Sequence, residues 1–284
     1  GKQAYTVFNR KTRESIRIVL KNRPEGLSRE ESFAYYQSKE PSEIFYVTPV
    51  KITLPESAKP YESFGCSCCG ETAGSNWIRF VDGKPLTVIA LTGTNGKTTT
   101  KELIREVLSV KYRVTANEGN LNNSIGVPLT LLKINSETQL AVVEMGASHP
   151  GDIKELVDIA LPNFGLVTNV GKAHLLGFGS FEGVKATKGE LYDYLRRTSD
   201  KVFLNVDNPH LCQMASERNL QSDPERPYSL VLPYGLSLMG AEVLPSDAEH
   251  PFLRIRLQDR IVNTNLVGSY NADNVMAAIA VGQH

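Results

Sequence analysis

The stretch Leu91-Thr-Gly-Thr-Asn-Gly-Lys-Thr-Thr-Thr100 decides the fold of this chain. It follows the apolar run Thr87–Leu91 and precedes residues 101–108, where apolar side chains recur at helical spacing. A strand, a glycine-rich turn and Lys-Thr at the start of a helix form the pattern of a phosphate-binding P-loop. Leu91 stands where the general pattern has its first glycine, so the motif is present in a shorter version.

Each residue type in this loop has a physical role in holding a phosphate. Gly93 and Gly96 allow a tight turn whose backbone N–H groups face one anion, and the helix start adds partial positive charge. We expect Lys97 to reach the terminal phosphates and the Thr98 hydroxyl to hold Mg²⁺. The alternative is a glycine turn followed by a chance Lys-Thr. The loop predicted to bind ATP consists of Gly93, Thr94, Asn95, Gly96, Lys97, Thr98 and Thr99.

Composition excludes several classes of protein. The 284 residues carry 31 basic and 31 acidic side chains, and no basic stripe is present, which argues against a nucleic-acid-binding protein. No apolar run approaches 18 residues and no signal-peptide pattern begins the chain, so no membrane association is expected. Four cysteines in a chain of this length do not make a disulfide framework. A reducing, cytoplasmic location fits these features.

Residues 1–85 differ in pattern from the rest and are predicted to form a separate, small α+β segment. Short strands are expected at 4–8, 15–20, 44–47 and 50–54. The capping box Ser28-Arg-Glu-Glu31 predicts a short helix over the residues that follow.

Two cysteines in this segment, Cys66 and Cys69, have the spacing with which two thiolates bind one Zn²⁺. A closed zinc site needs four ligands, and no second C-x-x-C follows. Cys68 or a partner chain would have to complete the site, and free or buried thiols in a turn are an equally open reading. Residues 44–84 resemble the zinc-ribbon tail of a family of proteins related to formylmethanofuran dehydrogenase, without the second half of that motif.

From Leu86 onward, strand and helix signals alternate. The strands are near-continuous apolar runs, which predicts an α/β fold with a doubly wound, mainly parallel sheet. A small antiparallel appendage follows, with strands at 241–244, 252–257 and 260–267, and then a helix over 272–281. The parallel strands are expected at 87–91, 113–116, 139–144, 164–169, 201–206 and 228–232, and the helices at 97–110, 127–134, 152–160, 183–196 and 209–217.

Ligands of such sheets bind at the carboxyl ends of the strands, where several polar residues fall. Glu144 ends one strand and is well placed to hold Mg²⁺, although it could instead cap the next helix. His174 follows another strand and is either a metal or phosphate contact or a structural histidine. Lys188 and Lys185 lie in a predicted helix, where the default interpretation is a solvated surface lysine. Asn120, Asn122 and Asn123 form an amide-rich loop that suits a polar substrate or an ordinary turn.

Taken together, these motifs resemble the central ATPase domain of the Mur ligases. The resemblance covers residues 86 to 284. The motifs that carry it are Thr92–Thr100, Glu144-Met-Gly-Ala, Asn169-Val-Gly-Lys-Ala-His174, Lys188-Gly-Glu and Gly268-Ser-Tyr-Asn-Ala-Asp-Asn274. Two further stretches, 119–128 and 173–180, are similar to the family member that joins D-Ala-D-Ala to UDP-MurNAc-tripeptide.

The resemblance implies an amide-forming reaction in cytoplasmic peptidoglycan synthesis, in which ATP phosphorylates a carboxylate and an amine attacks the acyl phosphate. It implies that Thr98 and Glu144 hold one Mg²⁺ and His174 a second, and that Lys188 is carbamylated to serve as a further ligand. Lys97, Lys188 and His174 are then the catalytic residues, and Asn271 and Asn274 contact adenine. Tyr270 stands where many relatives have histidine, so ring stacking is retained and the protonatable group is not.

The expected partners are the small molecules UDP-MurNAc-tripeptide and D-Ala-D-Ala. Family members carry an N-terminal UDP-binding domain and a C-terminal ligase domain, and we expect both to be absent here, as in a fusion, a chimera or an incomplete record. Three alternatives stay open: a nucleotide-binding fragment without turnover, a ligase similar to folylpolyglutamate synthase, and a zinc-binding scaffold built on Cys66 and Cys69.

Overall fold

The computed structural model describes most of the chain from residue 84 onward. Its described residues are 4–9, 15–20, 45–49, 77–81, 84–171, 175–198, 200–220 and 230–284. Cys66, Cys69 and His174 lie outside them, as do the predicted strand at 50–54 and the helix after Ser28.

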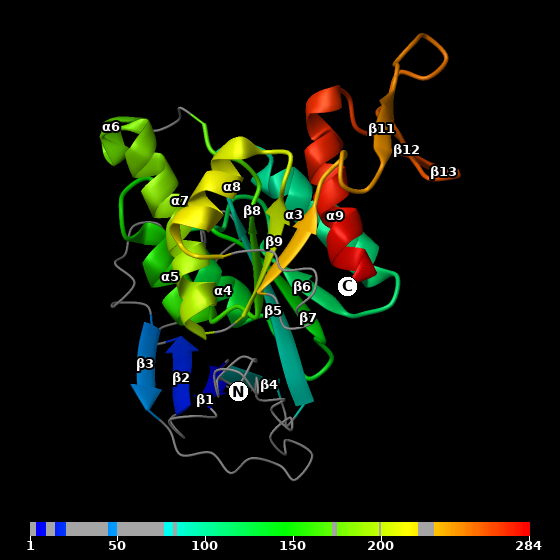
Figure 1. The fold of residues 1–284 in the computed structure, drawn as a ribbon. Coiled ribbons are helices and arrows are strands. Elements are labelled where there is room, and N and C mark those ends of the chain that lie inside the picture. Colours follow the sequence, from blue (N-terminus) through cyan, green and yellow to red (C-terminus); the bar gives the residue numbers. More distant parts are fainter. Residues whose placement is uncertain are drawn as a thin grey trace, which may run out of the picture.

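A parallel sheet forms the centre of the molecule (Figure 1). Among the described residues its order is β6-β7-β5-β8-β9-β10, and every neighbouring pair in it is parallel. This confirms the predicted α/β fold with a mainly parallel sheet. The strands are β5 (Lys84–Thr92), β6 (Val114–Ala116), β7 (Leu140–Glu144), β8 (Phe164–Val167), β9 (Lys201–Asn205) and β10 (Val231–Tyr234).

Strand β5 lies at the point where the order of the strands reverses. The chain builds β6 and β7 on one side of β5 and β8, β9 and β10 on the other. Connections that leave in opposite directions open a crevice at the carboxyl end of the central strand. The P-loop follows β5, so the predicted phosphate site lies in this crevice.

Helices cover both faces of the sheet because side chains of β5 alternate between the faces. Val88 and Ala90 belong to the core cluster formed with α4, α5, α7 and α8, whereas Ile89 and Leu91 belong to the cluster formed with α3 and α9. Figure 1 shows α5, α7 and α8 on one side of the sheet and α3 and α9 on the other. All four side chains are buried, which is the period-two pattern of a strand covered on both sides. The helices are α3 (Lys97–Ser109), α4 (Gly126–Leu131), α5 (Asp152–Ala160), α6 (Leu175–Phe178), α7 (Phe181–Thr198), α8 (Pro209–Glu217) and α9 (Ala272–Gln283), preceded by the 3₁₀ turn η2 (Ser269–Asn271).

The predicted antiparallel appendage is confirmed as a separate sheet beyond α9. It consists of β11 (Ala241–Leu244), β12 (Arg254–Leu257) and β13 (Arg260–Asn263), paired in chain order. In Figure 1 it projects from the side of the body that carries α9.

Among the described residues of the first 85, four antiparallel strands lie side by side, and one of them, β4, also pairs with β5. Their order is β4-β1-β2-β3, and β4 pairs with residues 84–86 at the start of β5. The predicted boundary at residue 85 therefore falls inside one continuous strand. The four are β1 (Ala4–Asn9), β2 (Ser15–Leu20), β3 (Phe45–Pro49) and β4 (Trp77–Val81).

Several element boundaries differ from the predictions by a few residues, and two of these differences have a clear physical reason. The strand expected to end at Leu232 continues through Pro233 to Tyr234, because β10 is an edge strand, where the missing N–H of proline costs no ladder hydrogen bond. The helix expected over 127–134 ends at Leu131, and Lys133 and Ile134 donate instead to carbonyls three residues earlier.

Candidate functional site

The P-loop connects β5 to α3 with a backbone that only glycine adopts without strain. Gly93 has φ of 148°, and a Cβ atom there would lie 2.0 Å from Thr168 Oγ1. Gly96 has φ of 75° at the start of α3, and its Cβ would lie 2.5 Å from Asn274 Oδ1. Glycine is therefore needed at both positions for two reasons: it allows the tight turn that the sequence predicted, and its missing side chain leaves room for a neighbouring side chain to come close.

Residues at the end of β8 hold the loop in place. The Thr94 N–H donates to Asn169 O (3.0 Å), and the Asn95 N–H donates to Asn169 Oδ1 (2.9 Å). Asn95 O in turn accepts from Thr168 Oγ1 (2.7 Å) and Asn169 Nδ2 (3.0 Å). The N–H groups of Thr94 and Asn95, which were expected to face an anion, thus donate to Asn169 instead. The first turn of α3, starting at Lys97, offers the N–H groups that a helix leaves without an internal acceptor.

Lys97 reaches back over the loop toward the pocket. Its Nζ donates to Thr94 O at 2.9 Å. Burial lowers the pKa of Lys97, and the nearby charge of Glu144 opposes that shift. Thr98, the next residue, is exposed at the helix start, and Thr99 is half-buried.

Glu144 ends β7 as predicted and is 1% exposed. Its Oε1 accepts a hydrogen bond from Asn122 Nδ2 (2.7 Å), whereas its Oε2 has no hydrogen-bond partner among the described residues. Lys101 Nζ lies 3.9 Å from Oε2. A buried carboxylate oxygen without a partner is unfavourable by itself and fits a hard cation such as Mg²⁺.

Lys188 and Lys185 of α7 are both buried, so the default interpretation of solvated surface lysines is wrong. Lys188 is 3% exposed and Lys185 is 5% exposed. Lys185 Nζ pairs with Glu182 at 2.8 Å, a structural role. Lys188 lines the pocket, with its Nζ 5.5 Å from the centroid of the Phe178 ring. Burial and then the charge of Lys97 lower its pKa to about 8, against the opposing charges of Asp152 and Glu190.

The three asparagines of the amide-rich loop lie in different environments. Asn122 lines the pocket while bonded to Glu144. Asn123 also lines the pocket, and its Oδ1 accepts from Gly126 N (2.8 Å), the N–H of the first residue of α4. Asn120 is exposed and is not part of the pocket lining.

Asn271 and Asn274 join the P-loop helix to α9. Asn274 Oδ1 accepts from Thr100 Oγ1 (3.0 Å), and Asn274 Nδ2 donates to Asn271 Oδ1 (2.9 Å). Asn271 Nδ2 donates to Val267 O at 3.0 Å. Both are 7% exposed, so the structure gives them a structural role in addition to the predicted contact with adenine.

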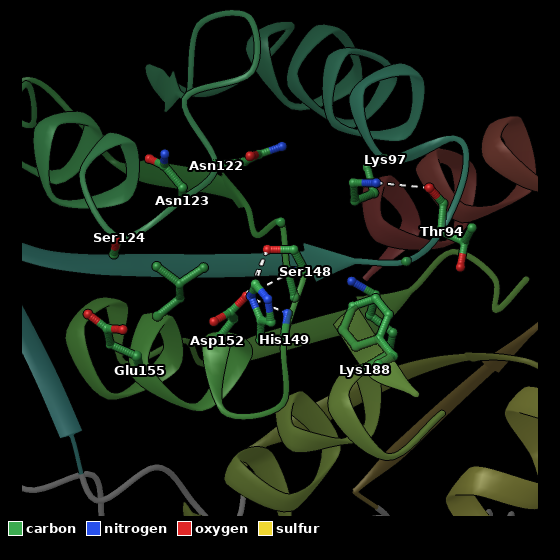
Figure 2. A pocket seen from close by; sticks show the side chains of 15 residues that line it. Thr94, Lys97, Asn122, Asn123, Ser124, Ser148, His149, Asp152, Glu155 and Lys188 are labelled. Atoms are coloured by element: carbon green, nitrogen blue, oxygen red, sulfur yellow. Dashed lines mark hydrogen bonds between the residues drawn. The ribbon is translucent and has the colours of Figure 1, made fainter. Parts of the chain in front are cut away.

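One pocket of about 420 Å³ is lined by Gly93, Thr94, Lys97, Asn122, Asn123 and Lys188, among others. Glu144 lies beside this pocket, bonded to Asn122 of its lining. Figure 2 shows Lys97 and Thr94 at one end, Asn122 and Asn123 on one wall, and Lys188 on another. The described residues contain no group of three His, Cys, Asp or Glu side chains placed to hold a metal ion. Glu144 is therefore the acidic ligand candidate that the described residues offer next to the P-loop.

Sequence reasoning missed the wall opposite the P-loop, formed by Ser148, His149 and the start of α5 (Figure 2). Asp152 Oδ2 accepts from the N–H groups of Ser148 (2.8 Å) and His149 (2.9 Å). Glu190 of α7 accepts from Gly151 N and Lys154 N, both at 2.8 Å, at the same helix start. An Asp that begins a helix is a capping signal, but its place in the pocket was not readable from the sequence.

The comparisons with known proteins agree with this geometry. The model of the Mur ligase middle domain matches residues 91–282. The chain belongs to the Mur ligase family. The part of the chain that the structure describes contains no helix with the length and apolar character needed to cross a membrane.

Similar proteins include UDP-N-acetylmuramoyl-tripeptide–D-alanyl-D-alanine ligases. The one from Bacillus subtilis is 36% identical over 201 residues, which cover 69% of this chain and 41% of the relative. The one from Escherichia coli is 43% identical over 139 residues, 49% of this chain and 30% of the relative. The chain thus spans less than half of the length of each of these relatives.

Solved structures of MurF have the same fold over this region. A crystal structure of MurF from Acinetobacter baumannii has a TM-score of 0.57 at 29% identity and covers 70% of this chain and 42% of that chain. MurF ligase from Thermotoga maritima, solved in complex with ADP, has a TM-score of 0.56 at 29% identity. The match covers 69% of this chain and 45% of that chain.

Proposed function

We propose that residues 86–284 are the ATP-binding part of a ligase that joins UDP-MurNAc-tripeptide to D-Ala-D-Ala through an acyl phosphate. Relatives known as UDP-N-acetylmuramoyl-tripeptide–D-alanyl-D-alanine ligases, one of them 36% identical over 69% of the chain, support this assignment over a ligase similar to folylpolyglutamate synthase. The observation that carries it is one pocket that contains a P-loop, two lysines of lowered pKa and, beside them, a buried carboxylate oxygen without a hydrogen-bond partner.

The residues of the site fit Mg²⁺ and a triphosphate. Glu144, with Thr98 of the P-loop helix, would hold one Mg²⁺, and His174 would hold a second together with Lys188 once that lysine is carbamylated. When bound, Mg²⁺ neutralises charge that builds on a transferred phosphoryl group. Lys97 adds a positive charge at the same place, and the first turn of α3 orients the phosphates.

Lys188 has the properties that carbamylation requires. The amine must be neutral to react with CO₂, and a pKa of about 8 leaves about a quarter of Lys188 neutral at pH 7.5, compared with about one in a thousand for an ordinary lysine. The ammonium group first loses one proton to solvent, and the neutral amine then attacks CO₂ and loses a second proton as the N–C bond forms. The two losses turn a cation into an anionic oxygen ligand, which the nearby positive charge of Lys97 would favour.

Substrate binding falls to the amide-rich wall. Asn122 and Asn123, with Asn120 at its exposed end, offer donors and acceptors for a polar peptide. Asn271 and Asn274 are assigned to adenine. Tyr270 precedes Asn271 in the chain and is 78% exposed, so its ring is available for stacking.

The test is calorimetric titration of the 284-residue chain with ATP and Mg²⁺. Wild type should bind, and Lys97→Ala should lose about 100-fold or more in affinity, because it removes a charge-assisted contact to phosphate. Equal affinity of the two proteins would contradict the proposal. Phosphate release with UDP-MurNAc-tripeptide and D-Ala-D-Ala then separates a ligase from a nucleotide-binding module without turnover. Elemental analysis decides the separate question of zinc at Cys66 and Cys69.

A further inference from the structure

Lys101 is a buried charge that the proposed reaction does not use. It lies one helical turn after Lys97 on α3, on the same face of the helix, and its side chain is 0% exposed. Lysine is almost never fully buried unless its ammonium group is paired or hydrogen-bonded. Its contacts therefore indicate what the charge is for.

The ammonium group of Lys101 connects three different segments. Its Nζ donates to Asn117 O (2.7 Å) and Gly119 O (3.4 Å), which belong to the turn that leads into the amide-rich loop. It pairs with Glu102 Oε1 on its own helix at 3.0 Å. The same group lies 3.9 Å from Glu144 Oε2, the oxygen without a hydrogen-bond partner.

The segment that Lys101 holds is itself bound to Glu144 at both ends. Asn117 Oδ1 accepts from Glu144 N (2.7 Å), and Asn117 Nδ2 donates to Glu144 O (2.9 Å). Asn122 Nδ2 donates to Glu144 Oε1 (2.7 Å), and Gly146 N donates to Asn122 O (2.7 Å). Residues 117–122 and the end of β7 are thus one hydrogen-bonded unit, and Lys101 fixes this unit to the P-loop helix.

We propose that Lys101 is a positioning residue that couples the nucleotide site to the amide-rich loop. From α3 it sets the place of the Glu144 carboxylate and of residues 117–122, so that a change at the P-loop helix reaches the wall assigned to the peptide substrate. This inference rests on the proposed function, because it assumes that ATP and Mg²⁺ bind at the P-loop and Glu144.

Lys101→Met, which retains the length of the stem and removes the ammonium group, tests the coupling. ATP affinity is measured by calorimetry in EDTA and in Mg²⁺. Without metal, the affinity should stay within about twofold of wild type, because Lys97 and the loop backbone are unchanged. The gain in affinity on adding Mg²⁺ should fall about tenfold, because Glu144 is no longer held in place. An unchanged gain would overturn the inference, as would a larger one, which would mean that Lys101 acts only by repelling the metal.

Amide hydrogen exchange at saturating ATP and Mg²⁺ provides the second readout. In wild type, nucleotide binding should slow exchange in residues 119–123, and in Lys101→Met this protection should be lost although the site is filled. A role in stability alone would leave the ligand-induced protection intact. Lys111→Met, which removes an exposed lysine just after the same helix, is the matched control and should behave as wild type.

Two outcomes keep the inference separate from the proposed function. If wild type fails to bind ATP with Mg²⁺, both are overturned; if wild type binds and the variant retains gain and protection, the inference alone is overturned. Should Lys101→Met not fold, Lys101→Arg is measured in the same way. It retains the charge, but its larger planar guanidinium cannot take the place of the fully buried ammonium group between Asn117 O, Gly119 O and Glu144 Oε2. Loss of protection is therefore again expected, and full protection overturns the inference.

Discussion

The two sides of the pocket are held together by different means. The P-loop side, Gly93–Gly96, is made of backbone, and hydrogen bonds from Thr168 and Asn169 fix its shape without any ligand. The charged part of the site consists of Glu144, beside the pocket, and Lys188, which lines it, and both are buried. Glu144 Oε2 has no hydrogen-bond partner among the described residues, and the pKa of Lys188 is about 8.

This difference separates shape from chemistry. A backbone loop satisfies its polar groups within the protein and can be rigid at little cost. Buried ionisable side chains that lack full compensation carry an electrostatic cost, which a cation, a phosphate or a covalent modification removes. Changes in the P-loop should therefore alter geometry and stability, whereas changes at Glu144 and Lys188 should alter the response to pH and metal.

The largest effect is expected at Gly93. A methyl group there would overlap Thr168 Oγ1 at 2.0 Å in a backbone conformation that L-residues rarely adopt. We expect Gly93→Ala to lower the free energy of unfolding by about 3 kcal/mol and to abolish measurable ATP binding. Urea denaturation and calorimetry measure the two quantities.

Gly240→Ala is the matched control for this change. Gly240 also has positive φ, 61°, but no atom lies within 4 Å of the added Cβ. It should cost only about 1 kcal/mol, from the left-handed conformation alone, and leave ATP binding intact. Equal losses in the two variants would show that backbone strain, and not the contact with β8, dominates at Gly93.

A smaller effect is expected at Asn169, which bonds the P-loop with its side chain. Asn169→Ala removes one acceptor from Asn95 N and one donor to Asn95 O, at 2.9 and 3.0 Å. Two such hydrogen bonds, at about 1 kcal/mol each, correspond to roughly 30-fold in ATP affinity. Asn265→Ala, at an exposed asparagine away from the pocket, should change neither affinity nor stability. An Asn169→Ala chain that binds ATP as tightly as wild type would mean that the helix start alone orders the loop.

The elements of this site that the sequence predicted are those with a local signal. The alternation of apolar runs and helical periods predicted the parallel sheet, and glycine followed by Lys-Thr predicted the P-loop. Glu144 was found because a strand ends there, and strand ends meet at one edge of the sheet.

What the sequence did not reveal depends on contacts between distant segments. Thr100 meets Asn274 across 174 positions, and Asn95 meets Asn169 across 74, and no local pattern encodes either contact. Lys101 is one polar residue in an amphipathic helix, so its burial became visible only once Asn117 and Glu144 were placed beside it. For Lys188 the residues alone favoured exposure, and the resemblance to a family reversed that reading.

The smallest effect concerns the charge of Lys188 and has a defined sign. Its pKa is about 8 in the folded chain against an ordinary value of 10.5, so between these two values the unfolded chain binds more protons. The free energy of unfolding should therefore rise with pH across this window, and the cost of the buried charge is present in full below pH 8. Since Lys97 is shifted in the same direction, the contribution of Lys188 is the difference between wild type and Lys188→Met, at most about 2 kcal/mol between pH 8 and 10. Urea denaturation in CO₂-free buffer measures it, with the exposed Lys111→Met as control. If the free energy of unfolding has the same slope against pH in Lys188→Met and Lys111→Met, then burial does not disfavour the charged form of Lys188. The amine then loses its physical reason for reacting with CO₂ near neutral pH.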